Sequence, residues 1–207
     1  MKAAAVISLS SLLLVTLVAF SPSLSSAASP PAKPLDISGQ TLLTGTGYYI
    51  LPVVRGRGGG VTLGQPRNGT CPLGVVQDQF EVSNGLPVTF SPASGKKGVI
   101  PLSTDLNIKF SAASICVQST VWKLGPHDDK TGQWFVTTGG AEGNPGRETI
   151  SNWFKIAELG KDYKLVFCPT VCNYCKVVCR DVGIYVDGAT RRLALSDVPF
   201  RVMFKKA

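Results

Sequence analysis

The sequence predicts an all-β fold that disulfides hold together. Short runs rich in β-branched and aromatic residues recur along the chain, and turn-forming residues separate them. The 207 residues include 22 glycines and 14 prolines, which are spread along the chain, and six cysteines. Frequent turns between short strands favour a sandwich or a barrel over a helical fold, and periodicity alone does not choose between these two.

The first 28 residues have the layout of a secretory signal peptide. Lys2 supplies a short positive region, and residues 3–20 are almost wholly apolar or small. Ser26 and Ala28 occupy the −3 and −1 positions of a small-residue cleavage site. We therefore expect residues 29–207 to form one exported domain with no membrane attachment after cleavage; an uncleaved membrane anchor is the competing interpretation.

The charge and the missing motifs exclude several classes of function. The formal charge is +8 at pH 7, or +7 once Lys2 is removed. Because the basic residues are scattered and export is expected, we expect no nucleic-acid partner. The chain has one histidine and lacks the G-x-S-x-G, H-E-x-x-H and G-x-x-x-x-G-K-[ST] motifs. We therefore expect neither an enzyme nor a cofactor.

The cysteines predict three disulfides. In an exported protein they should pair, and all of them lie after the signal peptide: Cys71, Cys116, Cys168, Cys172, Cys175 and Cys179. Cys172 and Cys175 lie at equal distances from the step between Asn173 and Tyr174, and so do Cys168 and Cys179. A two-residue turn at this step would pair each set across a hairpin, which leaves Cys71 for Cys116.

Two details qualify this hairpin. Pro169 cannot donate a strand hydrogen bond, so we expect an irregular or edge hairpin. Four thiolates within twelve residues could instead bind zinc, but only Cys172 and Cys175 have the C-x-x-C spacing of a zinc knuckle. Export also favours oxidation, and we expect disulfides and no metal.

Several segments carry strand signals. Residues 106–110 alternate apolar and polar side chains, as a half-buried strand does. Asp187-Gly188 predicts a hairpin turn before the run at 192–195. The remaining candidates are residues 48–54, 134–138, 164–167, 184–186 and 200–204.

A string of short segments, in order along the chain, carries a family resemblance. They are Leu35–Gly39, Gly45–Ile50, Gly143–Gly146, Trp153–Ile156, Tyr163–Pro169 and Leu193–Asp197. The chain resembles the plant Kunitz inhibitors, and their miraculin-like branch in particular. This resemblance implies a twelve-stranded β-trefoil with pseudo-threefold symmetry over residues 29–207. It also implies the pairings of Cys71 with Cys116, Cys168 with Cys179, and Cys172 with Cys175.

The resemblance implies a loop that docks to serine proteases like a substrate. An ungapped count back from residues 106–110 places P1 at Lys96 and P1′ at Lys97, between Gly95 and Gly98. A lysine at P1 suits a pocket with a carboxylate at its base, as in trypsin. The turn formers at 91–98 predict that the loop is exposed.

Two features weaken this assignment. Thr44 stands where the family has a loop-supporting asparagine, and a hydroxyl offers fewer hydrogen bonds than an amide, so we expect weaker bracing. The flanking glycines should also loosen the lysine pair. The competing interpretation is a mobile basic turn with no protease partner. Arg147 is a second, poorer P1 candidate.

The resemblance therefore implies a monomeric, secreted inhibitor of trypsin-like serine proteases, which acts in plant defence outside the cell, in the cell wall or in the vacuole. The alternative is a non-inhibitory storage or carbohydrate-binding protein of the same fold. Asn68-Gly69-Thr70 is an N-glycosylation sequon and predicts a glycan on Asn68.

Overall fold

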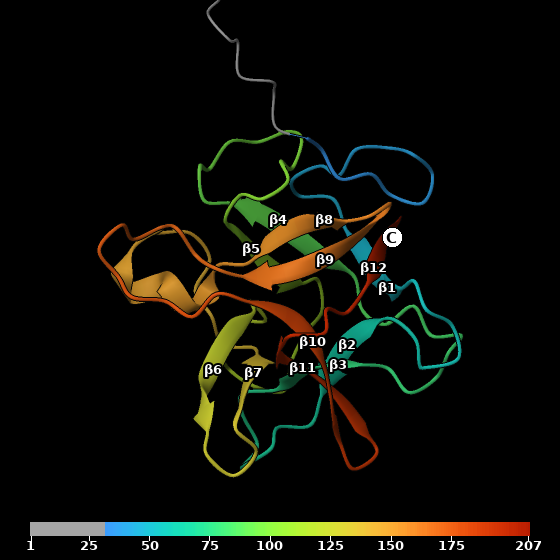
Figure 1. Ribbon diagram of the computed structural model, residues 1–207, viewed down its shortest axis with the longest axis vertical. Helices are drawn as coiled ribbons and strands as arrows, with labels where there is room; N and C mark the ends of the chain where they lie inside the picture. The colour runs from blue at the N-terminus through green and yellow to red at the C-terminus, as the bar shows by residue number, and fades with distance from the viewer. Residues whose placement is uncertain (1–31) are drawn as a thin grey trace, which may run out of the picture. The chain divides into compact units, whose positions relative to one another are not determined.

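The computed structural model describes residues 32–207, so the predicted signal peptide lies outside the described residues. Within this range no helix is long and apolar enough to cross a membrane. The elements, in chain order, are β1 (Tyr48–Pro52), β2 (Val61–Gly64), β3 (Gly74–Gln77), β4 (Val88–Pro92), β5 (Leu106–Phe110), β6 (Lys123–Asp128), β7 (Gln133–Thr137), the 3₁₀ helix η1 (Arg147–Asn152), β8 (Lys155–Leu159), β9 (Asp162–Phe167), β10 (Arg180–Asp187), β11 (Thr190–Ser196) and β12 (Val202–Lys206) (Figure 1).

Six of these strands form a closed antiparallel barrel. β1 pairs with β12 and β4, and β4 pairs with β5. β8 pairs with β9, and β9 pairs with β12. A bridge between Leu106 of β5 and Phe154, the residue before β8, closes the ring. Closure removes the free sheet edges that an open sandwich would leave.

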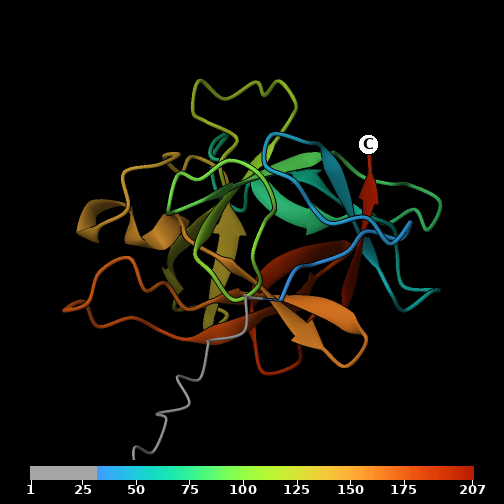
Figure 2. The same cartoon turned by 90° about the horizontal axis from the view of Figure 1, so that it is seen from above.

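The other six strands form three hairpins that pair with one another. β2 pairs with β3, β6 with β7, and β10 with β11. β3, β7 and β11 also bond to one another across the hairpins. Each third of the chain thus contributes two barrel strands and one hairpin, and long loops surround the strands (Figures 1 and 2). This confirms the β-trefoil with pseudo-threefold symmetry.

The core forms from the alternating faces of the barrel strands. β1 buries every second residue, and Leu106, Ile108 and Phe110 of β5 are buried as their alternation predicted. The rings of Trp122 and Phe154 meet edge to face, with centroids 6.0 Å apart. Such apolar burial stabilises the fold by about 25 cal/mol for each Å² removed from water.

The disulfides join the predicted pairs: Cys71 to Cys116, Cys168 to Cys179, and Cys172 to Cys175. All six cysteines are therefore oxidised, and the zinc interpretation is wrong. The last ladder pair of β9 and β10 is Phe167 with Arg180, which lies just inside the Cys168–Cys179 bridge. Beyond it the segment 168–179 is irregular, as Pro169 predicted.

Some predicted boundaries differ from the observed ones. The strand expected at 48–54 ends at Pro52, and the strand expected at 200–204 begins at Val202. The hairpin turn is one residue later than predicted, at Gly188-Ala189, because Asp187 still pairs with Thr190. Gly188 supplies the positive φ, 60°, that this turn needs.

Candidate functional site

The candidate loop connects two paired barrel strands. Residues 93–105 join β4 to β5, and the pair Pro92 and Leu106 closes the ladder below them. Residues 94–99 are exposed, whereas Ile100 and Leu102 are buried in the core. The loop therefore has an exposed tip on a C-terminal limb that is fixed by hydrophobic burial.

Backbone hydrogen bonds hold both limbs of this loop. The Ala93 N–H donates to the Asp105 carbonyl at 2.8 Å and closes the base. On the C-terminal limb, the Ile100 N–H donates to Leu42 and the Ser103 N–H donates to Ile156, each at 2.8 Å. Because these partners belong to different segments, the loop cannot shift as a unit without breaking several bonds.

Thr44 contacts the loop at the position that the resemblance indicated. Its N–H donates to the Gly98 carbonyl at 2.8 Å, and its hydroxyl oxygen accepts from the Gly98 N–H at 2.9 Å. Leu43 and Val99 form a bridge beside this contact. In Figure 1 the blue segment that carries Thr44 lies beside the green loop. The hydroxyl thus braces one amide of the loop.

The two lysines lie at the exposed tip between two glycines with positive φ. Lys96 and Lys97 are both exposed, and Gly95 and Gly98 have φ values of 66° and 120°. Other residues rarely adopt such angles, so these glycines bend the chain into and out of the lysine pair. Within residues 32–207 neither lysine forms an ion pair. Both side chains are therefore available to a partner.

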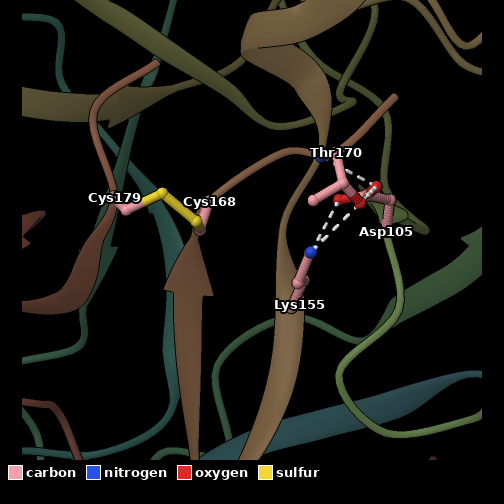
Figure 3. The surroundings of a disulfide bond; sticks show 5 residues. All are labelled: Asp105, Lys155, Cys168, Thr170 and Cys179. Atoms are coloured by element: carbon pink, nitrogen blue, oxygen red, sulfur yellow. Dashed lines mark hydrogen bonds and ion pairs between the residues drawn. A yellow bond between two sulfur atoms is a disulfide. The ribbon is translucent and has the colours of Figure 1, made fainter. Parts of the chain in front are cut away.

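A buried polar cluster anchors the C-terminal end of the loop (Figure 3). The carboxylate of Asp105 is 7% exposed and accepts hydrogen bonds from the N–H of Thr170, at 2.9 Å, and from its hydroxyl. Lys155 Nζ lies 3.6 Å from the other carboxylate oxygen and 3.2 Å from the Thr170 hydroxyl. Thr170 follows Cys168 by two residues, so the Cys168–Cys179 bridge restrains the segment that holds the loop base.

A second ion pair lies beneath the loop. Ser91, near the end of β4, donates to Glu142 at 2.6 Å, and Lys109 of β5 donates to the other oxygen of Glu142 at 3.1 Å. The hydrogen bond from Ser91, supported by Lys109 and opposed by partial burial, holds the pKa of Glu142 below its ordinary value. Glu142 therefore links the two strands that carry the loop.

The other two candidate positions have different surroundings. Arg147 is exposed but is the first residue of η1, and a helical backbone does not present the extended chain that a protease binds. Asn68 and the rest of its sequon are exposed, which leaves room for the predicted glycan. Neither Arg147 nor Asn68 belongs to the lysine loop, residues 93–105.

Residues 35–206 match the family model of the Kunitz legume inhibitors, described as trypsin and protease inhibitors. The chain belongs to this family. It is 60% identical to Kunitz trypsin inhibitor 5 of Arabidopsis thaliana over 181 residues, which cover 87% of this chain and 88% of the relative. It is 55% identical to miraculin of Synsepalum dulcificum over 196 residues, which cover 91% and 89% of the two chains.

A solved Kunitz structure agrees with this membership. The bifunctional alpha-amylase/subtilisin inhibitor of rice, Oryza sativa, superposes with a TM-score of 0.70 at 37% identity and covers 86% of this chain and 100% of its own. The names of these relatives show that Kunitz proteins differ in what they bind. Family membership alone therefore does not identify what this member binds.

Proposed function

We propose that this protein is a secreted inhibitor of trypsin-like serine proteases, with Lys96 as P1 and Lys97 as P1′. The observation that carries the proposal is the exposed Lys96 on a loop whose base is closed by a backbone hydrogen bond and whose C-terminal limb is hydrogen-bonded to other segments of the fold. A loop that is ordered before binding loses little conformational entropy on association. The ammonium group of Lys96 complements the carboxylate at the base of a trypsin-like pocket.

The same architecture favours inhibition over digestion. If the protease cuts after Lys96, the hydrogen bonds between Thr44 and Gly98 still hold the C-terminal side of the cut, and the bond from the Ala93 N–H to the Asp105 carbonyl still ties the N-terminal side to the base of the loop. The Cys71–Cys116 disulfide encloses the cut and keeps the two fragments covalently joined. Because the two new ends stay close together, re-formation of the peptide bond competes with release of the cut protein.

The remaining features of the proposal follow from the sequence. The protein acts as an inhibitor rather than as an enzyme, works as a monomer and needs no cofactor. The signal sequence at residues 1–28 supports export to the extracellular space, the cell wall or the vacuole. Export and protease inhibition together fit a role in plant defence, with a glycan on Asn68.

Titration of active trypsin with the oxidised protein tests the proposal. We expect stoichiometric inhibition that persists over time, and Lys96→Ala should weaken it at least about a hundredfold because the P1 side chain is the buried anchor of the complex. Lys97→Ala should weaken it less. Arg147→Ala, which removes an exposed charge outside the loop, is the matched control and should leave inhibition unchanged.

The outcomes separate the candidate functions. Full inhibition by both lysine variants would show that another loop binds the protease. Loss of inhibition in Lys97→Ala alone would move P1 by one residue. If the intact, folded protein does not inhibit trypsin at any ratio, the proposal fails and the storage or carbohydrate-binding alternative replaces it.

A further inference from the structure

A second site lies away from the lysine loop. A pocket of about 380 Å³ opens between the β10–β11 hairpin and two other segments, residues 52–57 and 198–201. Neither Thr44 nor any residue of the loop 93–105 lines it. Its size is in the range of small-molecule sites.

The walls and rim of this pocket are apolar. Ile184 and Phe200 are half-buried along its sides. Three valines at its margin are unusually exposed: Val54 by 49%, Val186 by 58% and Val198 by 75%. Exposed apolar side chains that gather around one hollow mark a surface that gains free energy when it is covered.

The charged groups of the pocket are all positive. Arg57, Arg191 and Arg201 line it, and no acidic residue does. Arg201 is neutralised by Asp162 at 2.8 Å, but within the described residues neither Arg57 nor Arg191 has a carboxylate partner. Burial, followed by the charge of Arg57, lowers the pKa of Arg191. Two like charges therefore share one hollow without a counterion.

The turn that carries Arg57 is fixed by its own contacts. Glu81 accepts hydrogen bonds from the N–H groups of Gly56, at 2.9 Å, and Gly58, at 3.1 Å. A Cβ atom on Gly58 would lie 2.5 Å from the Asp78 carbonyl oxygen, so only glycine allows the chain to pass this closely. The backbone on both sides of Arg57 is thus held in place, and the charge is presented from a rigid turn.

A buried amide at the pocket lacks a partner. Gln77 is 3% exposed, and its Oε1 accepts from Arg191 Nε at 2.8 Å. Its Nε2 has no hydrogen-bond partner among the described residues. An unpaired buried donor costs free energy. Gln77 lines the same hollow as Arg57 and Arg191, and its bond to Arg191 holds that guanidinium group at the pocket.

We propose that this pocket binds a small amphipathic anion, a single carboxylate or sulfonate group on an aromatic or short aliphatic body. The acid group pairs with the guanidinium groups of Arg57 and Arg191. The apolar body lies against Ile184 and Phe200. The site is independent of protease binding, because the two share no residue.

The test uses 8-anilinonaphthalene-1-sulfonate as the probe, with fluorescence and calorimetric titration of the oxidised protein. We expect saturable binding of one molecule, weakened about tenfold by Arg57→Gln and by Arg191→Gln, since each removes one charge-assisted contact. Arg147→Gln makes the same charge change outside the pocket and should bind like the unchanged protein. The uncharged analogue N-phenyl-1-naphthylamine should bind at least about tenfold more weakly than the sulfonate.

Arg57→Gln is the deciding variant, because among residues 32–207 the Arg57 side chain forms no hydrogen bond or ion pair, whereas Arg191 also bonds to Gln77. An unchanged thermal unfolding midpoint and unchanged trypsin titration confirm that the variant is folded. The proposal is overturned if the probe does not bind saturably, if Arg57→Gln keeps full affinity, or if the uncharged analogue binds as well as the sulfonate.

Discussion

The buried carboxylate of Asp105 gives the sharpest prediction about the loop. Asp105→Ala removes two hydrogen bonds from Thr170 and leaves Lys155, whose side chain is 14% exposed, without its partner at 3.6 Å. Hydrogen bonds to charged groups contribute about 1.5–3 kcal/mol each, and removing one member of a buried ion pair costs about 3–5 kcal/mol. Because the ion pair is long, we expect the free energy of unfolding to fall by about 3 kcal/mol.

Two measurements check this value. Urea unfolding, followed by the fluorescence of the buried Trp122 and Trp153, gives the free energy of unfolding. Titration against trypsin gives the dissociation constant, which should rise about tenfold because the loop base is no longer fixed before binding. Asp105→Asn keeps the shape of the side chain and one acceptor oxygen for Thr170. Its free energy of unfolding and its dissociation constant should therefore lie between those of the unchanged protein and of Asp105→Ala.

The matched control is Asp129→Ala, since the Asp129 side chain is 95% exposed and lies on another loop. It should change neither unfolding nor inhibition. The reasoning is refuted if Asp105→Ala unfolds with the same free energy as this control. It is also refuted if stability falls while trypsin binding stays unchanged, because the cluster would then hold the barrel and not the loop.

Three further predictions concern the supports of the loop and the fold. Thr44→Val removes the acceptor of one loop amide but keeps the shape, so trypsin binding should weaken about fivefold in the same titration. Glu142→Gln should lower the free energy of unfolding by less than about 1 kcal/mol at pH 7, because the carboxylate is 40% exposed. Because the pKa of Glu142 is lowered in the folded state, this stability difference is fully present above pH 4.5, the ordinary pKa of a glutamate. It disappears as the pH falls through the folded-state pKa, and urea unfolding at pH 7 and at pH 3 measures the change. Replacing Cys172 and Cys175 by serine should cost about 2 kcal/mol, since so short a closed loop restricts the unfolded chain little, and a loss above about 4 kcal/mol in calorimetry would contradict this estimate.

Parts of the fold could be predicted because their signal is local. The strand at residues 106–110 alternates along its own length and was found at its exact bounds. The concentric cysteines predicted both bridges of the segment 168–179. Other strands lack a local signal: β3 is buried at all four positions, and β6 contains Gly125 and Pro126 and pairs through a register shift. The choice of a trefoil came from the family resemblance, since periodicity does not report how strands close into a barrel.

The candidate site shows the same division. Lys96 and Lys97 lie on an exposed loop, as the turn formers predicted, whereas their assignment as P1 and P1′ stays a prediction. The resemblance indicated that Thr44 contacts this loop. The cluster of Asp105, Lys155 and Thr170 could not be predicted, because three single residues of ordinary type come from separate segments and meet only in the folded protein. The flanking glycines were expected to loosen the loop, but their positive φ values show that they also shape it.

The most direct test of the account is to identify the peptide bond that trypsin meets. The oxidised protein is incubated with a catalytic amount of trypsin at mildly acidic pH, reduced, and analysed by mass spectrometry. We predict a single cut between Lys96 and Lys97, with the two fragments held together by the Cys71–Cys116 disulfide until reduction. A first cut after Lys97, after Arg147 or at many sites at once would contradict the assignment of Lys96 as the residue that the protease binds.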